Sequence, residues 1–203
     1  MASTQFQPGE DGIEEEFERV FSSELPLSNG LGQHLLLKSL YRDKKAIIIF
    51  VRHFLCYVCR DYMKELARIP VDVLDKINVR LVVIGCSPHK HINPLKEELG
   101  FKHDVYCDAE RVVYRGLGLN TTLALGKASS QHVTSSLVGG LTNFVTGAVS
   151  TGLQGDVRQQ GGAFIVAQDG TVEFWHRDSG SLDHAPIDDL LAHVGARPLA
   201  TYK

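Results

Sequence analysis

Long apolar runs and helical repeats alternate through the first half of the chain. The runs KAIIIFV over 45–51 and VRLVVIG over 79–85 are apolar almost throughout, as is typical of strands covered on both faces of a parallel sheet. Apolar residues then recur at spacings of three and four over 56–69, and Pro70 follows, which predicts a helix that ends before the proline. This order predicts βαβ units around a central parallel sheet.

Shorter elements continue the alternation. The chain opens with a weak signal for a hairpin of 23–27 and 33–37. After the second long run we predict a helix over 92–99 that stops at Gly100, a strand over 104–107 and a helix over 109–117. The C-terminal part predicts a β-hairpin of 163–167 and 171–176 with its turn at Asp169-Gly170, and then a helix over 187–194 after Pro186. A parallel half followed by an antiparallel hairpin and a helix is how a thioredoxin-type α/β sheet is built. The fold predicted is therefore a central mixed sheet flanked by helices.

Two stretches depart from this pattern. Residues 1–15 are polar and acidic and contain Gly and Pro, which predicts a flexible tail. Residues 118–161 are rich in Gly, Ser and Thr, and we interpret them as an insertion with one or two short helices around 130–148. The expected organisation is a tail over 1–15 and a single domain over 16–203.

Composition narrows the class of partner and compartment. The 203 residues carry a formal net charge of −3, whereas nucleic-acid binding needs a concentrated basic face. No apolar run reaches the roughly 20 residues that span a bilayer, and the acidic N-terminus resembles neither a secretory signal nor a transit peptide. We therefore expect a cytoplasmic protein with no nucleic-acid or membrane partner, as a monomer or homodimer.

Four cysteines carry the candidate chemistry: Cys56, Cys59, Cys86 and Cys107. In a reducing compartment a disulfide framework is improbable, so any disulfide is expected to be transient and chemical. Cys56 directly follows the first strong strand and opens a helix, where unpaired backbone N–H groups favour a thiolate over a thiol. We therefore assign Cys56 as the nucleophile and Cys59, one turn on, as the residue that resolves the intermediate as a disulfide.

Three basic residues stand near this pair. Arg52 and His53 lie just upstream, and Arg60 lies just downstream. Any of them that faced the sulfur of Cys56 would lower the pKa of its thiol further.

Two alternatives remain for the pair. Zinc needs four ligands, usually a second pair at finger-like spacing, whereas Cys86 and Cys107 are single and follow separate strands. Free cysteines are also among the most buried residues, so the pair could simply fill a core. Thiol chemistry is favoured over both, and we predict no metal site.

Other residues receive plainer interpretations. We interpret Cys86 and Cys107 as core or strand-end residues, with a role as a secondary redox partner as the alternative. For His176-Arg177-Asp178 a surface salt bridge is favoured over an approach to the active-site face. His89 and His91 are interpreted as the entry to a helix, and Met63 and Trp175 as packing residues.

Several separated motifs then show a resemblance to a known family. They are FVRHFLCYVCRDY, VVIGCSPHKHINP followed by GFKHDVYCDAERVVYRGLGL, QGDVRQQGGAFIV, and HRDSGSLDHAPI. Over roughly 20–195 the chain resembles the peroxiredoxin-like 2 proteins (AhpC/TSA antioxidant-domain, selenoprotein-U-like), and within them the C-type branch. The resemblance implies a thioredoxin-like fold, a redox centre on Cys56 and Cys59, no bound cofactor, and the thioredoxin/NADPH system as electron source.

The chain departs from typical peroxiredoxins around this centre. Ile49 and His53 stand at the Pro and Thr positions of the PxxxTxxC motif, and Gly161 stands where the peroxiredoxin Arg would fall, with Arg158 close by. Gly161-Gly162 also replaces the cis-proline of thioredoxin. These departures favour a slow or specialised peroxidase, or thiol–disulfide exchange, over fast peroxide reduction.

The sequence therefore predicts a peroxiredoxin-like thiol–disulfide oxidoreductase that reduces a peroxide or a disulfide and is recycled by a thioredoxin-type donor. The alternative is a non-catalytic redox-sensing or adaptor protein whose cysteine pair is a sensor or a vestige.

Overall fold

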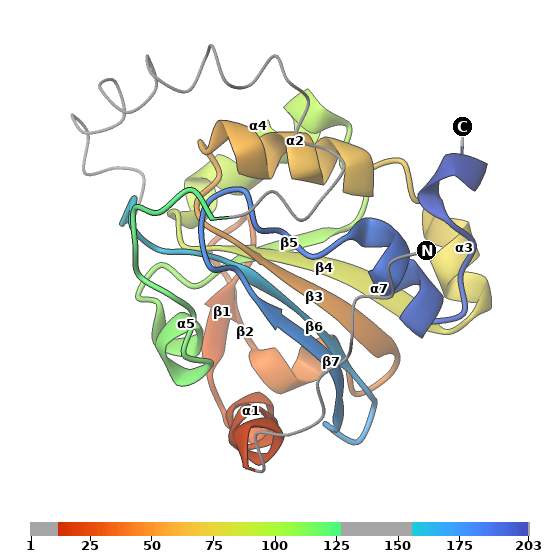
Figure 1. The fold of residues 1–203 in the computed structure, drawn as a ribbon, viewed down its shortest axis with the longest axis horizontal. Coiled ribbons are helices and arrows are strands. Elements are labelled where there is room, and N and C mark those ends of the chain that lie inside the picture. The colour runs from red at the N-terminus through yellow and green to blue at the C-terminus, as the bar shows by residue number, and fades with distance from the viewer. Residues whose placement is uncertain (1–11, 127–155, 203) are drawn as a thin grey trace.

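A seven-stranded sheet forms the centre of the molecule (Figure 1). The computed structural model describes residues 12–126 and 156–202. The strand order is β2-β1-β5-β4-β3-β6-β7, in which β3, β4 and β5 are parallel and the other neighbours pair antiparallel. The predicted mixed sheet, with its parallel half followed by an antiparallel hairpin, is confirmed.

The strands run as follows: β1 Pro26–Ser28, β2 His34–Leu36, β3 Lys45–Val51, β4 Val79–Gly85, β5 Asp104–Cys107, β6 Gly162–Val166 and β7 Val172–Arg177. The helices are α1 Ile13–Ser22, α2 Tyr57–Leu66, α3 Val71–Lys76, α4 Ile92–Leu99, α5 Val112–Gly116 and α7 Ile187–His193, with short 3-10 turns η1 Leu37–Leu40, η2 His89–His91 and η4 Leu199–Thr201.

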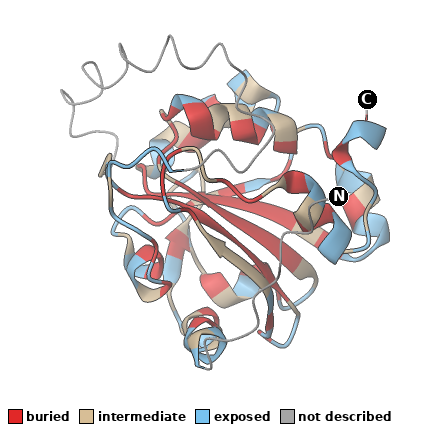
Figure 2. Cartoon of the chain, in the orientation of Figure 1, coloured by how far each residue is buried: buried red, intermediate tan, exposed pale blue. Residues whose placement is uncertain are grey.

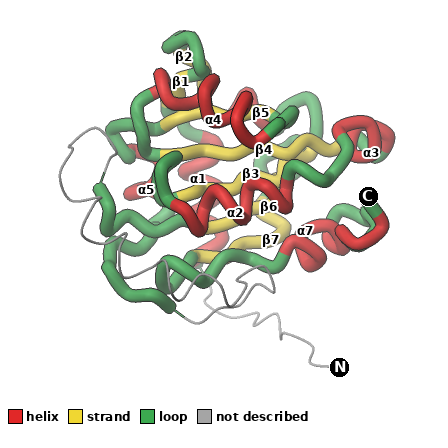
Figure 3. Tube along the Cα trace, turned by 90° about the horizontal axis from the view of Figure 1, so that it is seen from above, coloured by secondary structure: helices red, strands yellow, loops and turns green. Residues whose placement is uncertain are grey.

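Both faces of the central strands are buried (Figure 2). Alternate residues of β3 enter two separate apolar clusters: Ile47, Ile49 and Val51 pack towards α2, α4 and α7, whereas Ile48 and Phe50 pack towards α1 and α5. Seen from above, α2, α4 and α7 lie over the strands (Figure 3). Two covered faces explain why β3 and β4 have no polar alternation in the sequence.

The predicted N-terminal tail is wrong at its end, because Ile13–Glu15 form the first turn of α1. The acidic residues of this turn made the segment look polar, although it continues into the apolar face of α1 with Phe17 and Phe21, both fully buried. The Phe17 ring lies edge-on to Phe164 and Trp175, with ring centroids 5.2 and 5.4 Å apart. Packing against the sheet therefore outweighs the polar composition of the segment.

Two helices also differ from their predicted bounds. The helix predicted over 56–69 ends at Leu66, and Pro70 is the N-cap of α3, a helix that the sequence pattern did not indicate. The helix predicted over 109–117 begins only at Val112. There the buried carboxylate of Asp108 accepts hydrogen bonds from the backbone N–H of Val112 and Val113, which fixes the first turn.

The described flanks of the predicted insertion lie side by side. Thr121 and Gln159 form an antiparallel bridge, and Thr122 N–H donates to the Arg158 carbonyl at 2.8 Å. The short helices predicted around 130–148 lie outside the described residues. The flanks bring 156–161 to the carboxyl end of β3, beside the cysteine pair.

Candidate redox site

The loop between β3 and α2 presents the cysteine pair. Cys56 caps the N-terminus of α2 in an extended conformation, and its carbonyl accepts the first helical hydrogen bond from Arg60 N–H at 2.9 Å. Its own N–H donates to the His53 carbonyl at 3.0 Å, which tightens the turn. Both thiols are free, and Cys56 and Cys59 are only 2% and 1% exposed.

The two sulfurs have opposite acidities. A hydrogen bond from the Cys59 thiol holds the pKa of Cys56 well below its usual range; burial opposes this shift, and the Arg52 charge and His53 reinforce it. Burial, and then the contact with Cys56, raise the pKa of Cys59 well above its usual range. One proton shared by a close pair produces this split, in which Cys56 carries the negative charge. Cys56 is therefore the more acidic thiol of the pair, and Cys59 is its hydrogen-bond donor.

Arg52 supplies the cation at the site. Its Nη1 donates to the sulfur of Cys56 at 3.6 Å, while its Nε and Nη2 donate to the carbonyls of Gln159 and Val157. Its own carbonyl accepts a hydrogen bond from the Cys86 thiol. The guanidinium is thus held in place by backbone oxygens and directs its remaining donor at the thiolate.

His53 is buried next to the pair. Burial lowers the pKa of its imidazole, although the charge of Cys56 opposes that shift and Arg52 adds to it. Its side chain is only 2% exposed, and among the described residues its Nδ1 has no hydrogen-bond partner. His53 therefore stands close to the pair as a neutral imidazole at neutral pH.

The other two predicted arginines point elsewhere. Arg60 forms an ion pair with Glu98 on α4, and Arg158 binds the carboxylate of Asp156 with its side chain 60% exposed. Each finds an acidic partner at the surface, where its charge stays hydrated. Of these three arginines, it is Arg52 whose guanidinium donates to the sulfur of Cys56.

The glycine pair at the start of β6 leaves no room for a side chain. A Cβ on Gly161 would lie 2.0 Å from the Phe50 carbonyl oxygen, and one on Gly162 would lie 2.5 Å from the His176 carbonyl oxygen. Neither an arginine nor a proline side chain therefore fits at these positions, and no peptide bond among the described residues is cis. The cation of the site comes instead from Arg52, which directly follows β3.

The sequence interpretation missed one functional candidate, His184, and for Asp178 it favoured a surface salt bridge over a place near the active-site face. Asp178 and His184, whose side chains are 1% and 4% exposed, form a buried pair with Nδ1 2.8 Å from Oδ2. The prediction of a surface salt bridge at His176-Arg177-Asp178 is therefore wrong: the chain turns Asp178 inwards, and the Arg177 guanidinium lies over the rings of Phe17 and Trp175. The motif HRDSGSLDHAPI contains both partners, but no periodicity indicates their contact.

Cys86 and Cys107 are buried, as predicted, beyond and at the ends of neighbouring strands. Burial raises the pKa of the Cys86 thiol to about 12 and also raises that of Cys107. Cys86 belongs to the apolar cluster on the α1 side, whereas Cys107 shares the cluster of Cys56 and Cys59. Neither has the acidity of Cys56.

Two other features of the described chain bear on its class. No helix over 12–126 or 156–202 is long and apolar enough to cross a membrane. Over the same ranges, His, Cys, Asp and Glu side chains form no group of three that could hold a metal ion.

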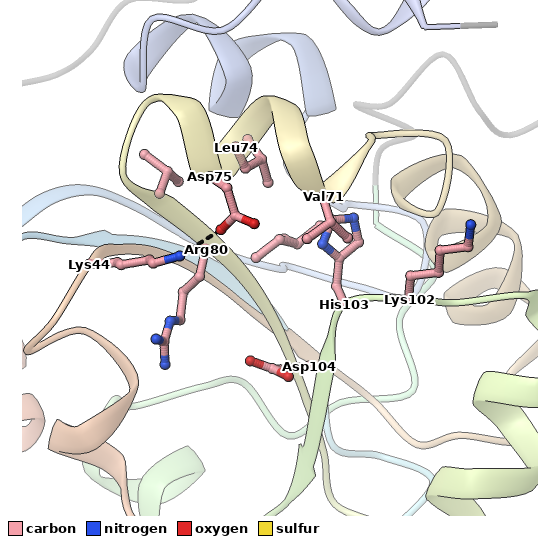
Figure 4. A pocket seen from close by; sticks show the side chains of 10 residues that line it. Lys44, Val71, Leu74, Asp75, Arg80, Lys102, His103 and Asp104 are labelled. Atoms are coloured by element: carbon pink, nitrogen blue, oxygen red, sulfur yellow. Dashed lines mark hydrogen bonds and ion pairs between the residues drawn. The ribbon is translucent and has the colours of Figure 1, made fainter.

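A small hollow of about 130 Å³ lies at the other end of the sheet, lined by both apolar and charged side chains (Figure 4). Lys44, at the amino end of β3, reaches Asp75 of α3 there at 2.6 Å. Cys56 follows the carboxyl end of β3, so the hollow and the cysteine pair lie at opposite ends of the strand.

The geometry places the chain in the class of thioredoxin-like redox domains: a dithiol caps the helix that follows the central parallel strand. Solved structures share this fold. The peroxidoxin BcpB of Mycobacterium tuberculosis superposes with a TM-score of 0.61 at 16% identity, over 85% of this chain and 92% of that one. Reduced Prx3 of Vibrio vulnificus in complex with hydrogen peroxide gives 0.60 at 14% identity, over 85% and 94%.

Sequence comparison defines the family. A family model described as AhpC/TSA antioxidant enzyme matches residues 65–180. Peroxiredoxin-like 2C of Mus musculus is 39% identical over 87% of this chain and 80% of its own length, and the Homo sapiens protein is 39% identical over 86% and 79%. A prostamide/prostaglandin F synthase of Salmo salar is 33% identical over 78% of each chain. The chain belongs to the peroxiredoxin-like 2 proteins of the AhpC/TSA family, and a redox function of the oxidoreductase type follows from that membership.

Proposed function

We propose that the protein is a thiol–disulfide oxidoreductase whose working group is the Cys56–Cys59 dithiol. The observation that carries this proposal is the environment of Cys56, which combines a helix N-cap, a donating Cys59 thiol and the Arg52 guanidinium at 3.6 Å. Each of these stabilises a thiolate, which is the nucleophilic form of cysteine. A merely space-filling pair of buried cysteines would gain nothing from that arrangement.

The reaction follows from the two acidities. The Cys56 thiolate attacks a peroxide oxygen, an S–O bond forms as the O–O bond breaks, and the departing alkoxide or hydroxide takes a proton. Cys59, as its thiolate, then attacks the sulfur of Cys56, so that an S–S bond forms and hydroxide leaves. A dithiol donor of the thioredoxin type reduces the disulfide and becomes oxidised itself. With a disulfide substrate, the Cys56 thiolate attacks sulfur instead of oxygen.

Replacement of the nucleophile tests this proposal. We expect Cys56→Ser to abolish peroxide-dependent NADPH consumption in an assay coupled to thioredoxin and thioredoxin reductase, because serine provides no thiolate. Cys107→Ser is the matched control, since it removes a buried thiol from the same cluster and should keep the wild-type rate. If Cys56→Ser consumes NADPH as fast as the wild type, the proposal is wrong.

A second function is favoured by the burial of the pair. With both sulfurs almost fully covered, at 2% and 1% exposed, a macromolecular donor must wait for the start of α2 to open. Such a dithiol could sense the redox state of the cytoplasm, where we expect the protein, and change its partners instead of turning over. Mass spectrometry after stoichiometric peroxide would show a Cys56–Cys59 disulfide in an oxidoreductase and in a sensor alike. The coupled NADPH assay separates the two, because a sensor forms the disulfide without steady turnover. A vestigial pair would form no disulfide, and the partners captured in pull-downs would not change with Cys56→Ser or Cys59→Ser.

A further inference from the structure

The buried Asp178–His184 pair has no place in the chemistry of two cysteines alone. Its side chains are 1% and 4% exposed, and burying an acid and a base together gives little net stability compared with apolar side chains of the same size. Pairs of this kind are found where a site needs a proton or a fixed charge. The position of this pair relative to the dithiol therefore matters.

Two contacts bring the pair to the dithiol. Tyr62 lies three residues after Cys59 on the buried face of α2, and its ring stacks on the imidazole of His184 with centroids 4.7 Å apart. From the other side, Asp178 N–H donates to the carbonyl of Gly161 at 3.1 Å. Gly161 directly precedes the residue paired with Phe50 near the carboxyl end of β3. His184 and Asp178 thus lie between the end of β3 and the face of α2 that carries Cys59.

The orientation of the imidazole is also fixed. Its Nδ1 is on Oδ2 of Asp178, so the other ring nitrogen faces away from the carboxylate. The Tyr62 hydroxyl donates to the Ala185 carbonyl at 2.7 Å, which ties the segment after His184 to α2. A ring held in this way by a carboxylate and an aromatic face keeps one tautomer and one position.

We propose that His184, oriented by Asp178, holds the proton that the dithiol exchanges in each redox cycle and sets the charge that Cys56 experiences. The proton transfers in this inference rest on the proposed function. The electrostatic coupling between His184 and Cys56 does not, because it is present in the reduced protein without turnover. Asp178 acts through His184 and is a positioning residue.

The charges around His184 support this assignment. Burial lowers the pKa of the imidazole, but Asp178 and the Cys56 thiolate raise it and the net shift is upward; Arg52 opposes them. Burial raises the pKa of Asp178, while His184 and His176 act to lower it. Other groups also act on the pair: His176, with Nε2 3.5 Å from Asp178 Oδ1, Asp183, with Oδ1 3.6 Å from His176, and the neutral Tyr62 and Tyr114.

The proton balance is then closed. As Cys59 attacks the oxidised Cys56, the imidazolium gives its proton to the departing hydroxide, and water leaves. His184 regains a proton from the Cys59 thiol, so that the sulfenic acid and the thiol become a disulfide and water with no net proton change. When a dithiol donor reduces the disulfide, the imidazolium protonates Cys59 as it leaves, and the donor's second thiol restores the proton.

The pH dependence of Cys56 alkylation tests the proposal. His184→Asn retains a side-chain N–H for Asp178 but has no titrating group. We expect iodoacetamide to modify Cys56 at acidic pH on the order of tenfold more slowly than in the wild type, with an unchanged rate on the alkaline plateau. His193→Asn, at an exposed position on α7, is the control and should follow the wild-type profile. A folded His184→Asn protein with the wild-type profile overturns the proposal.

A second measurement needs no change at His184. Coupling between two titrating groups is reciprocal, so the imidazole of His184, followed by NMR in the reduced protein, should titrate at lower pH in Cys56→Ser than in the wild type. Identical titration curves in the two proteins overturn the inference, even where His184→Asn does not fold. Because neither measurement involves turnover, failure of the coupled NADPH assay would count against the proposed function alone.

Discussion

At the scale of single residues, the acidity of Cys56 depends on a few directed donors. The Cys59 thiol and Arg52 both face its sulfur, and the Arg52 guanidinium is fixed by two backbone carbonyls. A charge held in place loses little side-chain entropy when the thiolate forms. The Cys59 thiol first, and then the Arg52 guanidinium, therefore account for the low pKa of Cys56.

We expect Arg52→Met to raise the pKa of Cys56, because the cation opposite its thiolate is removed while the bulk of the side chain is retained. The rate of Cys56 alkylation at neutral pH should fall on the order of tenfold. Arg60→Met is the matched control, since its guanidinium pairs with Glu98 and its loss should leave that rate unchanged. Equal rates for Arg52→Met and the wild type would show that the helix terminus and Cys59 suffice.

At the scale of elements, the segment 156–161 joins the surface to the site. Asp156 binds Arg111 at 2.8 Å and Arg158 at 3.1 Å, and the next residues supply the carbonyls that hold Arg52. The hydrogen bond from Arg158, partly offset by burial, lowers the pKa of Asp156 to about 2. Because this pKa is depressed on folding, the carboxylate stabilises the fold above its unfolded pKa of 3.8 and loses that effect as pH falls towards 2.

Asp156→Asn should therefore lower the free energy of unfolding at neutral pH by about 1 kcal/mol, a value reduced for solvent screening of the ion pairs. The difference from the wild type should disappear as pH falls through the range in which Asp156 protonates. Urea unfolding at several pH values measures both. Asp72→Asn, in an ion pair with both side chains mostly exposed, should change little at any pH, and a constant difference for Asp156→Asn would contradict the assignment.

At the scale of the whole molecule, the sheet separates two apolar clusters. The dithiol belongs to the cluster under α2, α4 and α7, whereas α1 covers the opposite face through Phe17 and Phe21. Interiors of this density tolerate few voids. The α1 face therefore stabilises the sheet that positions the dithiol without contacting it.

Phe17→Ala should lower the free energy of unfolding by about 3–5 kcal/mol, because it leaves a cavity beside Phe164 and Trp175. Urea unfolding measures this loss, and Leu31→Ala, at a position 74% exposed, should stay within about 0.5 kcal/mol of the wild type. Under conditions where the variant is folded, Cys56 should be alkylated at the wild-type rate. A slower rate would mean that α1 also shapes the redox site.

Much of the fold followed from the sequence because its signals are local. The apolar runs of β3 and β4 predicted a sheet with two covered faces, and the place of Cys56 between a strand and a helix predicted its N-cap. The bounds of α1 did not follow, because packing on the sheet surface decided them. Those of α5 did not follow either, because the buried Asp108 carboxylate accepts from the N–H groups four and five residues further on.

The sequence by itself determined the order of elements, the family resemblance and the residues of the dithiol. Only the tertiary structure decided which charges act on it. It selected Arg52 over Arg60 and Arg158, closed the Gly161 position to any side chain, and brought the buried His184–Asp178 pair beside the end of β3. The reason is that strand and helix patterns repeat over a few residues, whereas these contacts join segments far apart in the chain whose approach depends on the packed sheet.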